Sequence, residues 1–263
     1  MPFSFKTAFK QGFSTFKCSY SSLLGGAALF IVITLGVALV QYTINEALGL
    51  DTSNQQKTAP DLLIALFFTN VFVSGTLLLG LLLHRGQPSP LSTLFAGFSR
   101  YWAMVGIGFC IGLIVMGSVI ITIAFISWLT IVMENVASTA ASSAAFGPGI
   151  ALIILGGIAL LFFFITRLFF AGLLCIDPTT QYGITKSIST SWRMTKPIFW
   201  PLLGLLIVLI LIFCLSFLVF ILPAIFFAAP LLMAVLAAAY DLALNQYRAA
   251  GLDELQPEIG PEA

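Results

Sequence analysis

The sequence predicts an all-α fold, a polytopic membrane bundle of six transmembrane helices with amphipathic helices at the cytoplasmic interface. Three observations support this prediction. Of the 263 residues, 60% are hydrophobic and 8% are charged, whereas soluble domains carry about 25% charged residues. Apolar runs of about 20 residues, the length that crosses the hydrocarbon core of a bilayer, recur along the chain. The few cations gather at the ends of alternate runs.

Six apolar runs are long enough to span a membrane. The third and fourth runs exceed one perpendicular crossing, so we expect these helices to tilt or to extend beyond the lipid. Thr58 and Asp61 have the spacing of a capping box before the second run, which favours a helix start there. The predicted spans are Leu23–Tyr42, Leu62–Leu83, Tyr101–Met133, Gly149–Ile176, Ile198–Leu222 and Pro223–Tyr247.

The last two spans lie in one stretch, Ile198 to Tyr240, that contains no charged side chain over 43 residues. This length is too great for one straight span and sufficient for two. Pro223 and Pro230 are its only strong helix breakers, so we place a tight hairpin between them. The alternative is a single long, kinked helix.

The cations predict the orientation. With six spans and the N-terminus in the cytoplasm, ten cations fall on the cytoplasmic side, and only Lys57 lies outside. This bias follows the positive-inside rule and places both termini in the cytoplasm. The ten are Lys6, Lys10, Lys17, Arg85, Arg100, Arg167 in the cytoplasmic half of span four, Lys186, Arg193, Lys196 and Arg248.

Three cytoplasmic segments share one pattern of aromatic, small and basic residues: TAFKQGFSTFK, TLFAGFSRYW and SISTSWRMTK. Each precedes an odd-numbered span, and each predicts an amphipathic helix that lies in the membrane interface. The lipid-facing residues would be Phe5, Phe9, Phe13 and Phe16 in the first, Leu94, Phe95 and Phe98 in the second, and Ile184, Ile188 and Trp192 in the third. The predicted contacts with anionic lipid headgroups are Lys6, Lys10, Lys17, Arg100, Trp102, Lys186, Trp192, Arg193 and Lys196.

Aligning these segments at Gly12, Gly97 and Ser191 gives spacings of 85 and 94 residues, about two spans with their connections. We therefore expect a threefold repeat of an interfacial helix plus a transmembrane hairpin, with units at about 3–84, 88–176 and 183–248. The alternative is that juxtamembrane segments select the same residue types independently. Residues 1–248 would form a single membrane domain, followed by an acidic tail, 249–263, with a composition typical of disorder.

The stretch RLFFAGLLCIDPTTQYGITKSISTSWRMTKPIFWPLLGLL resembles a group of six-helix bacterial membrane proteins. The group includes YciC-like inner-membrane proteins and the membrane domain found beside some glycerophosphodiester phosphodiesterases. The shared features are an arginine in span four (Arg167), an acid at its end (Asp177), Gly183, a Ser-aromatic-basic phrase (Ser191–Arg193) and an aromatic pair (Phe199–Trp200). The chain departs from the group because an Asp-Pro pair stands where a glutamate is typical, and because it has no phosphodiesterase domain. The resemblance implies the six-span fold and a bacterial inner-membrane location, and it does not imply hydrolysis.

The sequence contains no recognisable catalytic, metal-binding or cofactor-binding motif, so we predict a protein that is not an enzyme and binds neither metal nor cofactor. Its four cysteines are widely separated and its single histidine is His84, which we interpret as an interface residue. The scattered cations form no basic face for nucleic acid. Gly108 and Gly112 form a GxxxG pair that favours close helix approach, to a protein partner or to a second copy of the chain.

Three charged residues form the candidate polar core. Arg167 lies about 15 Å inside the predicted end of span four, at the rise of a straight helix, and Asp177 and Asp241 lie near cytoplasmic span ends. Charges within a bilayer are costly and usually face protein or water. Arg167 therefore either pairs with one of the two aspartates to lock helices together, or binds an anionic ligand.

Two functions remain open. One is a lipid-interacting or membrane-organising scaffold that serves as a platform for partners. The other is a transporter or channel with a cytoplasm-facing cavity near Arg167. A water-filled cavity beside Arg167 would favour transport, whereas a closed apolar core would favour the scaffold. An intramembrane enzyme would need clustered acids or histidines that the sequence does not contain.

Overall fold

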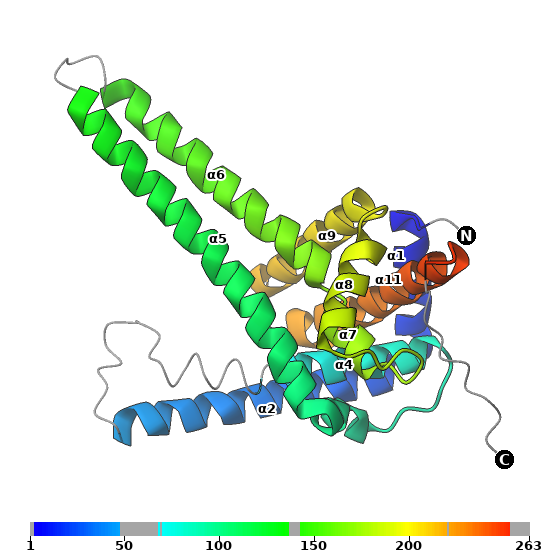
Figure 1. Cartoon of the computed structure of the whole chain (residues 1–263). Helices are drawn as coiled ribbons and strands as arrows, with labels where there is room; N and C mark the ends of the chain where they lie inside the picture. The colour runs from blue at the N-terminus through cyan, green and yellow to red at the C-terminus, as the bar shows by residue number, and fades with distance from the viewer. Residues whose placement is uncertain (1–2, 48–67, 69, 137–142, 220, 253–263) are drawn as a thin grey trace.

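The computed structural model describes residues 3–47, 68, 70–136, 143–219 and 221–252, and this described part is helical, with no strand (Figure 1). The predicted all-α class is therefore confirmed for these residues. Most of the acidic tail lies outside them. The helices are α1 (Phe5–Cys18), α2 (Tyr20–Ala47), α4 (Asn70–His84), the 3-10 helix η3 (Leu91–Arg100), α5 (Tyr101–Val136), α6 (Ser143–Leu168), α7 (Ala171–Ile176), α8 (Ile184–Thr195), α9 (Phe199–Val219), α10 (Ile221–Pro223), the π-helix η4 (Ala224–Ala228) and α11 (Ala229–Ala249).

Five helical segments of the described part are long and apolar enough to cross a membrane, which supports a multi-pass membrane protein. The second predicted span, Leu62–Leu83, lies partly outside the described residues, and its described portion is the shorter apolar helix α4. The count of six spans therefore stays a prediction. The five segments are Tyr20–Glu46, Leu91–Trp128, Ile153–Ile176, Phe199–Leu218 and Ala224–Ala249.

The hairpin predicted between Pro223 and Pro230 is wrong. Residues 221–249 continue as helix through α10, η4 and α11, so both prolines lie within helical structure. Pro223 falls in the first turn, where its missing N–H leaves no bond unmade. Pro230 is the second residue of α11, just after the π-helix η4, a local widening that accommodates an interrupted hydrogen-bond ladder. The single-helix alternative is also wrong, because α9 ends at Val219 and is separate from α11 (Figure 1).

The buried core lies where the helices converge, around α4, α7 and α11. In Figure 1, α2 and the long pair α5 and α6 diverge from this core. The divergent parts carry exposed apolar side chains, among them Leu35 and Leu39 on α2 and Ile121 on α5. Large apolar surfaces of this kind are stable against hydrocarbon and not against water. The lipid-exposed part of the molecule is therefore formed by the outer halves of the long helices.

All three amphipathic segments form helices, and each packs on another helix of the core: α1 on α11, η3 on α4, and α8 on α6 and α7. A small residue stands at each close approach. A Cβ added at Gly12 would meet Val235, one added at Gly97 would meet the Val71 carbonyl oxygen at 2.7 Å, and the Ser191 hydroxyl donates to the Arg167 carbonyl at 2.8 Å.

On η3, Leu94 is buried, so the prediction that it faces lipid is wrong. Gly75 of α4 has no side chain, so the backbone of Leu94 lies directly against it. Phe95 and Phe98 are exposed, and their rings contact Phe72 edge-on. One side of η3 is therefore used for packing on protein, and only the other side is available to lipid.

Candidate functional site

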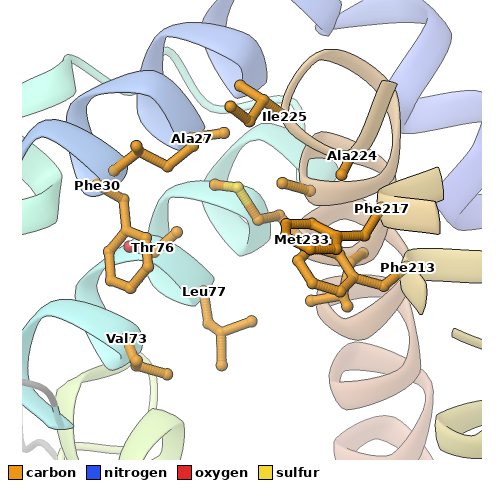
Figure 2. Close-up of a pocket in the computed structure, with 13 residues that line it drawn as sticks. Ala27, Phe30, Val73, Thr76, Leu77, Phe213, Phe217, Ala224, Ile225 and Met233 are labelled. Atoms are coloured by element: carbon orange, nitrogen blue, oxygen red, sulfur yellow. The ribbon is translucent and has the colours of Figure 1, made fainter. Parts of the chain in front are cut away.

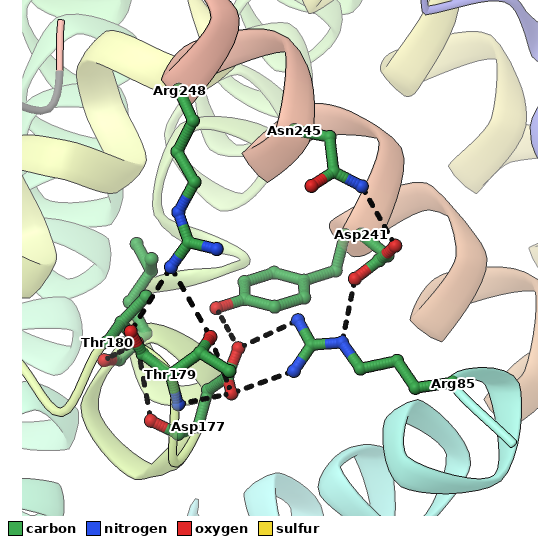
Figure 3. A network of polar contacts seen from close by, with 9 residues as sticks. Arg85, Asp177, Thr179, Thr180, Asp241, Asn245 and Arg248 are labelled. Carbon is green, nitrogen blue, oxygen red and sulfur yellow. Dashed lines mark hydrogen bonds and ion pairs between the residues drawn. The ribbon is translucent and has the colours of Figure 1, made fainter. Parts of the chain in front are cut away.

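Three ionised side chains from distant parts of the chain meet where α4, α7 and α11 converge (Figure 3). Arg85 follows α4, Asp177 ends α7 and Asp241 lies on α11. Nη1 and Nη2 of Arg85 donate to the two carboxylate oxygens of Asp177 at 2.9 and 3.1 Å, and Nε donates to Oδ1 of Asp241 at 2.8 Å. One guanidinium therefore binds two carboxylates, with the bidentate geometry that lysine cannot reproduce.

The Asp177 side chain is 0% exposed, and further donors surround it. The backbone N–H and the hydroxyl of Thr179 each donate to its Oδ1 at 3.0 Å, and the Tyr240 hydroxyl donates to Oδ2 at 3.0 Å. Pro178 stops the helix at this point, so the carboxylate lies at the helix end, where the free backbone N–H of Thr179 can reach it. The buried charge is thus fully compensated.

Two more residues of α11 complete the cluster. Asn245 donates its amide to Oδ2 of Asp241 at 3.0 Å, and Arg248 donates through Nη2 to the carbonyl of Thr179 at 3.1 Å. The α7–α8 loop is therefore bound to α11 both at Asp177 and at Thr179, as Figure 3 shows.

The electrostatics of the cluster favour the charged state of its buried members. Burial alone would raise the pKa of the Asp177 carboxyl, but hydrogen bonds from Arg85 and Thr179, with the charge of Arg85, hold this pKa below its ordinary value. Burial alone would lower the pKa of Arg85, whereas its bonds to Asp177 and Asp241 raise it. The pairing thus favours the charged forms of both Arg85 and Asp177.

The pairing predicted for Arg167 is wrong, because Arg85 binds both aspartates. Sequence reasoning identified Asp177 and Asp241 as members of the candidate core, but it did not identify Arg85 as their partner. Arg85 directly follows an apolar run, a position where an interfacial cation is expected for topological reasons alone. Only the folded arrangement of α4, α7 and α11 distinguishes a structural arginine from a cation that faces headgroups.

Arg167 lies instead among three aromatic rings. Its guanidinium carbon is 5.2 Å from the ring centroid of Phe163, 5.3 Å from Trp192 and 5.2 Å from Phe199. Nη1 donates a long bond of 3.4 Å to the Trp192 carbonyl, and Nε is buried with no hydrogen-bond partner among the described residues. Arg167 lies in the last turn of α6, and the chain turns before α7. The apolar segment Ile153–Ile176 still extends beyond it, so its depth in the bilayer stays a prediction.

The predicted headgroup contacts fall into two groups. Most are solvent-exposed, including the three lysines of α1. On the same helix the rings of Phe5, Phe9 and Phe13 stack in a row, with neighbouring centroids 6.1 and 6.5 Å apart. Arg100 is occupied instead by the carbonyl of Gln181 at 2.7 Å. The ammonium of Lys186 lies 4.0 Å from the ring centroid of Tyr182, and Trp192 is part of the ring cluster around Arg167. The exposed contacts are Lys6, Lys10, Lys17, Trp102, Arg193 and Lys196.

The GxxxG pair of α5 is split between two environments. A Cβ on Gly108 would meet the side-chain amide of Asn70, so this glycine serves packing within the chain. Gly112 has open space around its Cβ position. Contact with a protein partner or a second copy therefore stays a prediction for Gly112 and is not needed to explain Gly108.

A cavity of about 470 Å³ lies between α2, α4, α9, η4 and α11 (Figure 2). Its lining is carbon and sulfur apart from Thr76, whose hydroxyl already donates to the Phe72 carbonyl at 2.7 Å. A smaller cavity of about 180 Å³ lies between α4, α5, α6 and α7 and includes Asn70 and Ser74. Arg167 lines neither of these two cavities.

His84 is not only an interface residue, since its Nδ1 lies 2.7 Å from the hydroxyl of Thr15 and so connects α4 to α1. In the described part of the chain, His, Cys, Asp and Glu side chains form no group of three that could hold a metal ion. Comparisons with protein families, with curated protein sequences and with solved structures found no significant match to this chain.

Proposed function

We propose that this protein is a lipid-interacting, non-enzymatic membrane protein that organises the cytoplasmic leaflet and serves as a platform for partners there. One observation carries the proposal: the three amphipathic helices pack on the core, while the lysines of α1 and the tryptophans at the starts of α5 and α9 stay exposed. Trp102 and Trp200, at the starts of α5 and α9, are 76% and 78% exposed. Exposed tryptophan beside lysine and arginine is the composition that binds the headgroup region.

The proposal includes the topology predicted from the sequence: six spans, both termini cytoplasmic, in the inner membrane of a bacterium. The N-terminal helix α1 and the C-terminal end of α11 lie together, since the Phe3 N–H donates to the side chain of Gln246 at 3.0 Å. Termini that lie together at one end of the bundle are consistent with a single cytoplasmic face.

We also propose the threefold repeat, for which the packing offers a reason. In the predicted units, η3 of the second packs on α4 of the first, α8 of the third packs on α6 and α7 of the second, and α1 of the first packs on α11 of the third. The contacts form a closed cycle. The ion-pair network also joins the three units. Arg85 follows α4 of the first, Asp177 follows α7 of the second, and Asp241 lies on α11 of the third. This arrangement would hold three interfacial helices at fixed positions around one centre.

The two cavities favour the scaffold over the transporter. A transporter for an anionic substrate needs polar groups that face a hydrated path, whereas the larger cavity is apolar and Arg167 lines neither. The buried cations and acids of the Arg85 cluster bind one another.

Replacing Lys6, Lys10 and Lys17 together with Gln tests the proposal. Each cation near an anionic surface contributes up to about 1 kcal/mol. We therefore expect removal of all three to lower the apparent affinity for phosphatidylglycerol at least about tenfold while the fold is retained. The measurement is a thermal-shift titration of the detergent-solubilised protein with phosphatidylglycerol and, separately, with phosphatidylcholine. The matched control replaces the same three lysines with Arg and should bind as the wild type does. An unchanged preference for phosphatidylglycerol in the Gln variant would contradict the proposal.

A further inference from the structure

Arg167 is a cation that has no acidic partner in the described part of the chain. Both aspartates near the core belong to Arg85. The only hydrogen bond of the Arg167 guanidinium there is the 3.4 Å contact of Nη1 with the Trp192 carbonyl, and Nε has none. A partly desolvated guanidinium with its donors unused is costly unless an anion completes it.

Two hydrogen bonds from α8 to the backbone of Arg167 fix its position. The hydroxyls of Ser191 and Thr195 donate to its carbonyl oxygen at 2.8 and 3.3 Å, which pins the last turn of α6 to α8. Both hydroxyl groups belong to buried residues. The side chain therefore leaves a rigid junction of α6 and α8 and does not depend on a mobile segment.

The three rings around Arg167 hold its guanidinium and do not neutralise it. Cation–π contacts with Phe163, Trp192 and Phe199 hold the planar group in place. Among the described residues, its Nε and Nη2 make no hydrogen bond and Nη1 makes only the long one. A planar fork with free donors is the geometry that binds two oxygens of a phosphate.

The surroundings are positively charged and interfacial. Arg193 and Lys196, on and just after α8, are exposed. Trp200, next to Phe199 and 78% exposed, contacts that ring with centroids 5.4 Å apart. Cations together with an exposed tryptophan mark the level of lipid phosphates.

We propose that Arg167, oriented by Phe163, Trp192 and Phe199, binds one phosphate group, with Arg193 and Lys196 as flanking cations. The proposal rests on the proposed lipid-interacting function and names its specific site. The phosphate belongs to an anionic lipid or to a free phosphate, and the two sources share the same chemistry of recognition.

The test is native mass spectrometry of the full-length chain released from detergent with phosphatidylglycerol added. The wild type should keep one phosphatidylglycerol per chain at collision energies that remove phosphatidylcholine. Arg167→Gln should weaken that retention at least tenfold. The matched control is Lys57→Gln, which removes the one cation that the sequence places on the external side and should keep the tightly held lipid. Equal retention by Arg167→Gln and the wild type would overturn the site.

A second arm separates the two sources of phosphate. Inorganic phosphate is titrated into delipidated protein and thermal unfolding is followed. A rise in melting temperature that requires Arg167, with no lipid retained, supports a free phosphate as the ligand; retained lipid with no response to phosphate supports the lipid. If neither ligand depends on Arg167, the site is wrong, and if wild-type protein also shows no preference for phosphatidylglycerol, the proposed function fails with it.

Arg167→Lys serves as a second variant in case the Gln variant does not fold. It keeps the charge and removes the planar fork, so retention of phosphatidylglycerol should fall several-fold, to a value between the wild type and Arg167→Gln. Retention equal to that of the wild type would overturn the bidentate geometry.

Discussion

Replacing Arg85 with Ala should destabilise the folded protein by about 3–5 kcal/mol, the cost of removing one partner from a buried ion pair. The reason is the Asp177 carboxylate, which is 0% exposed and would lose two hydrogen bonds and its counter-charge together. Asp241 would lose its cation as well, although its side chain is 22% exposed and can be hydrated. The measurement is thermal unfolding of the purified protein in a mild detergent at neutral pH.

A double-mutant cycle separates the ion pair from simple loss of packing. Arg85→Ala combined with Asp177→Asn should recover part of the stability, because no charge is then left buried without a partner. Arg167→Ala combined with Asp177→Asn should show no such coupling, since the two residues belong to separate clusters. Wild-type stability of Arg85→Ala would show that the network does not hold α4, α7 and α11 together.

Gly12→Ala should lower stability by about 1–3 kcal/mol, the usual effect of overpacking a close contact. A methyl group at residue 12 would meet the Cα of Val235, with the backbone nitrogen at 2.9 Å and Cγ2 at 2.8 Å. Because the obstacle includes backbone atoms, no rotamer change can relieve it, and α1 must move away from α11. The same thermal unfolding assay measures the effect.

Gly36→Ala is the matched control, because Gly36 is also a helical glycine and its Cβ position has open space. Alanine is the better helix former by about 1 kcal/mol, so this substitution should leave stability unchanged or raise it. A loss at Gly36 as large as that at Gly12 would show that packing of α1 on α11 is not the cause.

Hydropathy and charge were sufficient to predict the membrane class and the helical nature of the three amphipathic segments. Both signals are local, because lipid selects apolar residues over about 20 consecutive positions and helical periodicity is read within a few turns. The same local patterns place the three lysines of α1 on its polar side, and these lysines are exposed. They could not show that Gly12 packs on α11, more than 200 residues away in sequence. The prediction that Phe16 faces lipid is wrong, because Phe16 is buried and its ring contacts Phe227 of η4.

The candidate site was predicted in part for a related reason. Asp177 and Asp241 stand out as acids beside apolar runs, but the choice between Arg85 and Arg167 as their partner depends on long-range packing. The turn in the last apolar stretch was misplaced because proline was read only as a helix breaker. The π-helix η4 allows Pro230 to remain within helical structure, and no sequence pattern in that stretch predicts a π-helix.

The central claim is that α1, η3 and α8 lie together at the cytoplasmic headgroups, held by one core. Its most direct test places single cysteines at Lys10, Ser99 and Ser189, one exposed position on each helix, in a variant without the four native cysteines. Spin labels at these sites are measured for depth in vesicles of phosphatidylglycerol and phosphatidylcholine, and a membrane-impermeant thiol reagent reports their side. All three labels should lie at headgroup depth on the cytoplasmic side; a label at the bilayer centre or on the external side would contradict the claim.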